Sequence, residues 1–316
     1  MNFIHSLAVG TAALLVLAVP HAHDPGSAVW RPGDEKAVQI VRRTLDAVEQ
    51  GWALAAYDRA SRMRTAINLR GTQPVVGITA NLVVDRGARR IRLDAAGDVG
   101  PLTLTGDPQR LLLYVPSLAQ FARRSGGLGA GDWLGAELSG EMAAIRSRLD
   151  AGYPLLVYRG REEIDGRPVE VVSDTPEPGA TTTYWIDATS FLPRRIVLSG
   201  AGRGEVRVDL AYGAGPRPVR ADIVSRGDRE LRVVLTPSYD GTGRVSRLQA
   251  VATPANGGSV TTDLSFDWSP ETGAGFFAFQ PPEGAVEVPF QQLATGVLLT
   301  AAGKLGAILQ ILSGSA

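Results

Sequence analysis

Apolar and polar residues alternate with a period of two over much of the chain, which is the pattern of half-buried antiparallel strands. In each run one set of side chains is apolar and the other polar, so one face of the resulting sheet should be buried and the other wet. The predicted strands centre on residues 63–69, 78–84, 91–93, 102–104, 111–115, 155–161, 168–173, 182–187, 195–199, 206–212, 231–236, 244–252 and 260–268.

Short turns separate these runs. Asp165-Gly166 is the strongest hairpin signal in the chain, and Asp240-Gly241 marks another turn. The stretch from 118 to 131 is rich in glycine and is expected to be irregular. So many strands with hairpin-length turns predict a mainly β fold, in which a meandering antiparallel sheet is either open or closed into a barrel.

Two segments have the period of a helix instead. Asp34 is suited to cap a helix that runs from Glu35 to Gln50, where apolar residues recur at helical spacing. A second helix is expected from Leu138 to Leu149. A helix of about 14 residues is only about 21 Å long, so these helices can cover only part of a large apolar sheet face. The uncovered part would form a hydrophobic cavity, unless large side chains fill it completely.

The N-terminus is typical of a secretory signal peptide. An apolar stretch from Leu7 to Val19 precedes Pro20-His21-Ala22, and it is shorter than the roughly 20 residues that a membrane span requires. We therefore expect a signal peptide over 1–22, a linker over 23–33 and a mature protein in the periplasm. The alternative is an uncleaved anchor.

The C-terminal residues 291–316 form a second apolar segment. On a helical wheel Val297, Leu305, Ile308, Leu309 and Leu312 share one side, which Lys304 interrupts. A helix docked on the sheet is the favoured interpretation. A helix on a membrane surface, a true span and a disordered tail are the alternatives.

Composition excludes several classes of chemistry. The chain has no Cys, and its three His are His5, His21 and His23, so the folded body lacks both residue types. This removes most Ser/His/Asp and Cys/His nucleophiles and the commonest metal ligands. We expect no metal, no cofactor and no enzymatic activity, and no lipid anchor, because there is no Cys to carry one. The 32 basic residues balance the 32 acidic ones, which gives no field to attract nucleic acid.

Three local clusters of residues are better explained as structural features than as catalytic or binding sites. The glycines between 126 and 131 fit neither the dinucleotide nor the P-loop spacing. Glu162, Glu163 and Asp165 are neighbours before a hairpin and are expected to lie in a solvated turn. The arginines between 86 and 92 are expected to form an exposed strand face, although they could contact lipid phosphates.

The sequence also resembles a known family, the periplasmic lipoprotein-carrier superfamily of LolA/LolB-like half-barrels. The resemblance extends over roughly residues 34–290, and its motifs are short. They are Leu113-Tyr114-Val115-Pro116, Gly160-Arg161 with Ile164-Asp165-Gly166-Arg167, Tyr184-Trp185-Ile186-Asp187 with Leu192-Pro193-Arg194-Arg195, and Phe277-Ala278-Phe279-Gln280-Pro281-Pro282-Glu283-Gly284-Ala285.

The resemblance implies one domain over 34–290, an open and strongly curved antiparallel sheet wrapped around helices. It also implies an apolar cavity for the acyl chains of a lipid or lipoprotein, bound without covalent chemistry. Envelope membrane proteins, or a membrane surface reached through the C-terminal helix, are further candidate partners. The candidate cavity residues are Ile67, Leu69, Ile78, Leu82, Ile91, Leu93, Leu102, Leu104, Leu112, Tyr114, Tyr184 and Ile186.

Three other functions stay open at this point. The same fold could serve as an envelope sensor that binds lipoproteins and regulates a membrane partner. A secreted hydrolase would need two carboxylates that face each other across a cleft. A passive structural β-protein would have a solid core without a cavity.

Overall fold

The computed structural model describes residues 34–52, 54, 57, 60–72, 75–98, 100–126, 138–151, 156–177, 179–200, 204–226, 230–255, 258–273 and 275–295. The predicted signal peptide and linker lie outside the described residues, as does the predicted C-terminal helix beyond residue 295. The chain divides into two compact units. Unit 1 contains Arg59–Gly135 and Val245–Ala316, and unit 2 contains Ser6–Asp58 and Ala136–Arg244.

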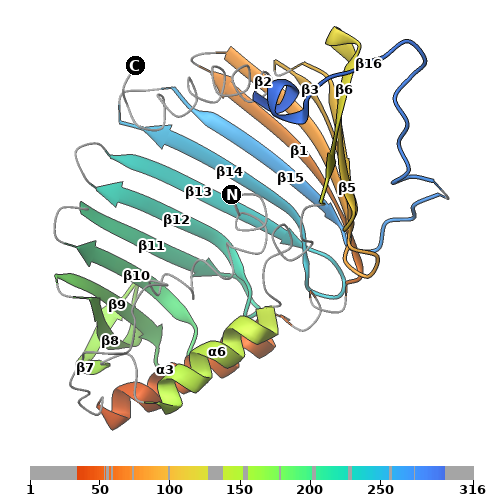
Figure 1. Ribbon diagram of the computed structural model, residues 1–316. Helices are drawn as coiled ribbons and strands as arrows, with labels where there is room; N and C mark the ends of the chain where they lie inside the picture. The colour runs from red at the N-terminus through yellow and green to blue at the C-terminus, as the bar shows by residue number, and fades with distance from the viewer. Residues whose placement is uncertain are drawn as a thin grey trace. The chain divides into compact units, whose positions relative to one another are not determined.

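Unit 1 is built of strands that follow the order β16-β6-β5-β4-β3-β2-β1-β15-β14 (Figure 1). Their pairing is antiparallel, except that the short β16 pairs parallel with β6. The bounds are β1 (Arg62–Thr72), β2 (Val75–Asp85), β3 (Arg90–Gly97), β4 (Leu102–Gly106), β5 (Arg110–Val115), β6 (Gln120–Ser125), β14 (Val245–Pro254), β15 (Val260–Asp267) and β16 (Val286–Glu287), with the 3-10 turn η1 (Pro116–Leu118) between β5 and β6.

Unit 2 has an antiparallel series of strands in the order β13-β12-β11-β10-β9-β8-β7 and two helices, α3 (Glu35–Gly51) and α6 (Leu138–Asp150). The strands are β7 (Val157–Ile164), β8 (Arg167–Glu177), β9 (Ala180–Asp187), β10 (Pro193–Gly200), β11 (Gly204–Tyr212), β12 (Pro218–Arg226) and β13 (Leu231–Tyr239). Both units therefore consist mainly of sequential hairpins.

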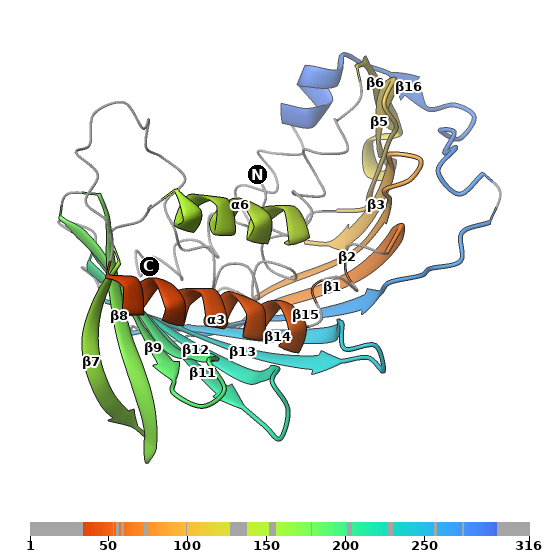
Figure 2. The ribbon, with the colours of Figure 1, turned by 90° about the horizontal axis from the view of Figure 1, so that it is seen from below.

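Helix α3 forms where the sequence predicts it. The carboxylate of Asp34 accepts hydrogen bonds from the backbone N–H groups of Lys36 (2.9 Å) and Ala37 (3.4 Å), which caps the first turn. The buried side of α3 packs on β7 and β8. Figure 2 shows α6 beside α3, and Arg146 of α6 forms ion pairs at 2.7 Å with Asp46 and Glu49 of α3.

The predicted fold class is confirmed: the protein is mainly β, with a large, curved antiparallel sheet that does not close and a few helices. Three strands are missing from the prediction: β6, β12 and the two-residue β16. The expectation of an irregular stretch is wrong for β6, because Phe121 and Ala122 are consecutive and both buried, which removes the alternation. In β12, Ala221 and Ile223 alternate with polar residues. Pro218 lies at the start of this strand, and a proline argues against a strand because it has no N–H to donate to the sheet.

Candidate ligand-binding face

Eight of the predicted cavity residues lie on one face of unit 1, which we call the apolar face. Leu93 on β3 lies opposite both Leu82 on β2 and Leu104 on β4, and Leu69 on β1 lies opposite Ile78 on β2. Directly opposed residues in an antiparallel pair point to the same side of the sheet, and residues two apart on a strand do so as well. The pairing therefore brings together Ile67, Leu69, Ile78, Leu82, Ile91, Leu93, Leu102 and Leu104.

The apolar face is only partly covered. Leu82 and Ile91 are 5% and 4% exposed, whereas the other six predicted residues are half-buried. Ala80 lies opposite Ala95 in the middle of this face, so short side chains separate the larger ones. An apolar surface of this kind, spread over adjacent strands, is suited to a flexible hydrocarbon chain.

One corner of the apolar face is packed by the end of the described chain. Residues 290–295 are helical, and Leu293 among them is 3% exposed. Leu293 forms a buried cluster with Leu113, Val115 and Ala122, against which Leu104 also packs. The chain thus begins to cover the apolar face at β4, β5 and β6.

Leu112 and Tyr114 are brought to the opposite side of unit 1, which we call the polar face. Leu112 lies opposite Thr105 and Tyr114 opposite Thr103. A segment that follows β15, with Phe276, Phe277 and Phe279, covers this side, and the ring of Tyr114 lies 5.6 Å from that of Phe279. In Figure 2 this segment and the helical turn at 290–295 lie on opposite sides of β6.

The arginines of β3 contact the same aromatic segment. Arg92 donates a 2.9 Å hydrogen bond to the backbone carbonyl of Phe276, and its guanidinium lies 4.9 Å from the ring centre of that residue. The guanidinium of Arg90 lies 4.7 Å from the ring centre of Phe277. The predicted exposed arginine face is therefore partly covered, and Arg92 is only 23% exposed.

Tyr184 and Ile186 belong to unit 2. They lie on the face of β9 that α3 also uses, because Ile186 is opposite Glu170 and Lys36 of α3 lies 3.8 Å from the Glu170 carboxylate. Ile186 is 1% exposed and contributes to the core. The structure therefore brings eight of the twelve predicted residues together and places Leu112, Tyr114, Tyr184 and Ile186 elsewhere.

A buried carboxylate accompanies Tyr184. The Tyr184 hydroxyl lies 3.3 Å from Oδ2 of Asp174, which is 2% exposed, and Oδ1 of Asp174 has no hydrogen-bond partner. Burial raises the pKa of Asp174 to about 6, and hydrogen bonds from Thr182 and Tyr184 offset only part of this rise. Sequence patterns miss this group because its partner comes from the next strand.

A hollow of about 650 Å³ lies over the centre of unit 1, and Ile67 is the one predicted cavity residue in its lining. Its walls come mainly from the polar face, in two cross-strand rows that include Asn68, Thr79, Asn81 and Asp94. One further cross-strand row, whose side chains point to the apolar face, completes the lining: Ile67, Ala80, Ala95 and Leu264. It is a wide, open depression whose lining includes Asp94, Arg247 and Asp263. Because covering such charged groups with a hydrocarbon chain is costly, we assign the apolar face rather than this hollow as the candidate site.

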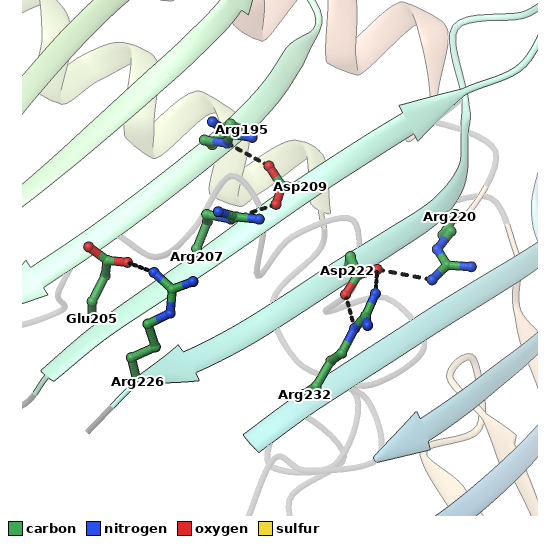
Figure 3. Close-up of polar contacts among 8 residues, drawn as sticks. All are labelled: Arg195, Glu205, Arg207, Asp209, Arg220, Asp222, Arg226 and Arg232. Atoms are coloured by element: carbon green, nitrogen blue, oxygen red, sulfur yellow. Dashed lines mark hydrogen bonds and ion pairs between the residues drawn. The ribbon is translucent and has the colours of Figure 1, made fainter. Parts of the chain in front are cut away.

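The face of unit 2 that points away from α3 carries two neighbouring carboxylates. Asp209 and Asp222 lie directly opposite each other on β11 and β12, and each is held by two arginines (Figure 3). Hydrogen bonding to Arg232 is the main cause that lowers the pKa of Asp222 to about 2. A glycosidase needs one of its two carboxyl groups protonated near neutral pH, and Asp222, with its lowered pKa, does not fit that role.

The described part of the chain contains no cluster of three or more His, Cys, Asp or Glu side chains that could hold a metal ion. Within the same residues, no helix has the length and hydropathy needed to cross a membrane.

The fold and the apolar face define a protein with an open, curved β-sheet and a partly covered apolar surface. No family model matches the sequence, and no curated protein shows a significant match. Solved structures do match, and they include proteins of the superfamily that the sequence resembles.

Three of these structures illustrate the similarity. A LolA superfamily protein from Nitrosomonas europaea is 14% identical, with 72% of this chain and 96% of that one covered and a TM-score of 0.29. An outer membrane lipoprotein-sorting protein domain from Vibrio parahaemolyticus is 12% identical, with 77% and 96% covered and a TM-score of 0.27. The Mycobacterium tuberculosis lipoprotein LppX is 13% identical, with 76% and 99% covered and a TM-score of 0.24.

Proposed function

We propose that this protein is a periplasmic carrier or binding protein for a hydrophobic ligand, a lipid or the acyl chains of a lipoprotein. The ligand is held on the apolar face of unit 1 without covalent chemistry. The observation that carries the proposal is the cross-strand register that aligns eight apolar residues on β1 to β4 while leaving six of them half-buried.

The energetics favour a long hydrocarbon chain. Burial of apolar surface is worth about 0.8 kcal/mol per CH₂ group, so a chain of about 16 carbons can offset its own immobilisation without a charged anchor. The alanine pair Ala80 and Ala95 provides space between Leu93 and Ile78 that such a chain can enter without displacing larger side chains.

The proposal is tested on protein purified from its own envelope. Native mass spectrometry with lipid extraction should show a co-purified lipid, and delipidated protein should bind dansyl-labelled undecanoic acid. Protein that emerges without ligand and takes up neither lipid nor the labelled fatty acid would contradict the proposal.

Two adjacent residues of β2 provide a matched pair of variants. Ile78 points to the apolar face and Thr79 to the polar face, and Thr79 is exposed. Ile78→Gln should weaken binding of the labelled fatty acid roughly tenfold, because a polar amide then lies under the hydrocarbon chain. Thr79→Gln should leave the affinity unchanged. Equal effects of the two variants would place the ligand elsewhere.

A further inference from the structure

A pocket of about 410 Å³ lies on the polar face of unit 1, between residues 277–281 and the strands β4, β5 and β6. We propose that this pocket, which we call the arginine pocket, binds a phosphate group through the guanidinium groups of Arg110 and Arg123 and the hydroxyl of Thr105. The arginine pocket lies on the opposite side of the sheet from the apolar face, so this site goes beyond the proposed binding of a hydrophobic ligand and does not depend on it.

The strand register gathers three donor side chains in the arginine pocket. Thr105 lies opposite Leu112, and Leu112 lies opposite Arg123, so these residues form one cross-strand row on the polar face. Arg110 comes two residues before Leu112 on β5 and points to the same side. Diagonal neighbours such as Arg110 and Arg123 lie roughly 7–8 Å apart, within reach of long side chains. Their guanidinium groups can therefore approach a single anion.

Both arginines are oriented by existing contacts and keep unused donors. Nε of Arg110 donates to Oδ2 of Asp107 at 3.2 Å, and Nη1 of Arg123 donates to Oε2 of Glu287 at 2.9 Å. The guanidinium of Arg123 also lies 4.7 Å from the ring centre of Phe121. A guanidinium group has five N–H donors, and the other donors of both side chains have no partner among the described residues. These N–H groups are available for the paired hydrogen bonds with which arginine recognises phosphate.

Thr105 supplies the third donor. It is only 6% exposed and lines the arginine pocket, yet its hydroxyl has no hydrogen-bond partner within the described part of the chain. Burial of a hydroxyl without a partner is unfavourable, and such groups are rare in folded proteins. An oxygen atom of a ligand in the pocket would provide the missing hydrogen bond.

The charges around the arginine pocket favour an anion with several oxygens. Asp107 is the carboxylate of the described lining, and its Oδ1 already accepts hydrogen bonds from the backbone N–H groups of Gln109 (2.8 Å) and Arg110 (2.9 Å). Burial opposes ionisation of Asp107, but these hydrogen bonds outweigh it and lower its pKa. Glu287, the partner of Arg123, lies outside the lining. A phosphate monoester has three strong acceptor oxygens, which match the two guanidinium groups and the hydroxyl.

Isothermal titration calorimetry of the full-length protein with inorganic phosphate tests the site. Arg123→Gln should weaken binding roughly tenfold or more, because it removes charge-assisted hydrogen bonds. The matched control is Arg124→Gln, which removes the same charge from the next residue of β6. Arg124 lies opposite Leu111 and therefore on the other side of the sheet. The control should change the affinity by less than about twofold, because salt screens distant charges.

Thr105→Val separates binding from folding. The substitution removes the hydroxyl without a partner and keeps a branched side chain of similar size. The free energy of unfolding, measured with urea, should therefore not fall. The affinity for inorganic phosphate should nevertheless fall about fivefold, as expected for the loss of one hydrogen bond to a charged group. Unchanged affinity would overturn the role of this hydroxyl.

A second measurement distinguishes the source of the phosphate group. Vesicle flotation compares phosphatidylcholine vesicles that contain phosphatidic acid with vesicles of phosphatidylcholine alone. A preference for phosphatidic acid that Arg123→Gln abolishes supports a lipid headgroup as the ligand. Binding of inorganic phosphate without this preference supports a small phosphate compound.

Two results would overturn the proposal. One is that neither inorganic phosphate nor phosphatidic acid binds. The other is that Arg123→Gln and Arg124→Gln weaken phosphate binding equally, because the overall charge would then attract the anion. Binding of dansyl-labelled undecanoic acid should be the same in the parent, Arg123→Gln and Thr105→Val. Phosphate binding without fatty-acid binding would support the arginine pocket and contradict the proposed carrier function.

Discussion

Asp209 and Asp222 lie directly opposite each other on neighbouring strands, and each is flanked by two arginines. Arg195 and Arg207 contact Asp209 at 2.6 and 2.7 Å, and Arg232 contacts Asp222 at 2.6 Å. Like charges that face each other across two strands destabilise a sheet unless counter-charges neutralise them. The arginines on this face therefore stabilise the β11–β12 pair.

Asp222→Asn should destabilise the protein by about 1–2 kcal/mol at pH 7, because it removes the carboxylate shared by two arginines. The pKa of Asp222 is lowered from 3.8 to about 2, so its contribution is complete above pH 4 and is lost as the pH falls through 2. Urea unfolding at pH 7 and pH 3 should show a smaller difference between variant and parent at the lower pH.

The matched control is the more exposed pair on the same face. Glu205 and Arg226 lie 3.4 Å apart, and both side chains are more than a third exposed. Glu205→Gln should change the free energy of unfolding by less than about 0.5 kcal/mol, because exposed ion pairs contribute little. An effect as large as that of Asp222→Asn would show that the whole network, rather than the shared carboxylate, carries the stability.

Asp174 should give the opposite dependence on pH. Burial raises its pKa from 3.8 to about 6, so the folded state binds this proton more tightly than the unfolded state does. The resulting stability is fully present below pH 4 and is lost as the pH rises through 6. Asp174→Asn, which mimics the neutral acid, should be more stable than the parent at pH 7.5 by on the order of 2 kcal/mol.

Thermal unfolding across the pH range checks this prediction. The gain from Asp174→Asn should shrink to nearly zero at pH 4, where the parent carboxyl is already neutral. Tyr184→Phe is a second useful variant, because it removes the hydroxyl donor that lies 3.3 Å from Asp174. It should lose more stability than the parent does as the pH rises to neutral, since the ionised carboxylate then lacks this hydrogen bond. A gain that is independent of pH would contradict the raised pKa.

The cap of α3 makes a local prediction. Asp34 accepts two backbone hydrogen bonds of the first turn, and its backbone N–H bonds the carbonyl of Leu156 at 3.0 Å. Asp34→Ala should cost about 1 kcal/mol, as the loss of other N-caps does. Glu35→Gln, in the same turn but without a capping bond, should cost less. The two free energies of unfolding can be compared by urea titration.

Alternation in the sequence was enough to predict the apolar face. On β1 to β4, polar and apolar residues take turns so regularly that the side of each residue follows directly, as for Ile78 and Thr79. Asp34 could likewise be predicted as a cap from its position before the first periodic run. These features depend on residues that are close together in the chain.

The features that the sequence did not predict depend on distant segments. Leu111 to Val115 is apolar throughout, because the turn with Leu293 covers one side of β5 and the segment with Phe279 covers the other. Alternation cannot assign Leu112 to a side under those conditions. The burial of Asp174 also depends on a neighbouring strand, so no local pattern reveals its shifted pKa.

Side-chain truncation should distinguish residues of the packed core from residues of the apolar face that contact the ligand. Ile186 is 1% exposed, and Ile186→Ala should destabilise the protein by about 2–5 kcal/mol, because it leaves a cavity in a packed core. Leu102 is half-buried on the apolar face, so Leu102→Ala should cost less than about 1.5 kcal/mol. Binding of dansyl-labelled undecanoic acid should respond in the opposite order, with a loss for Leu102→Ala and none for Ile186→Ala at temperatures where that variant is folded. If Leu102→Ala proves as destabilising as Ile186→Ala and leaves binding intact, the apolar face is part of a solid core and no ligand rests on it.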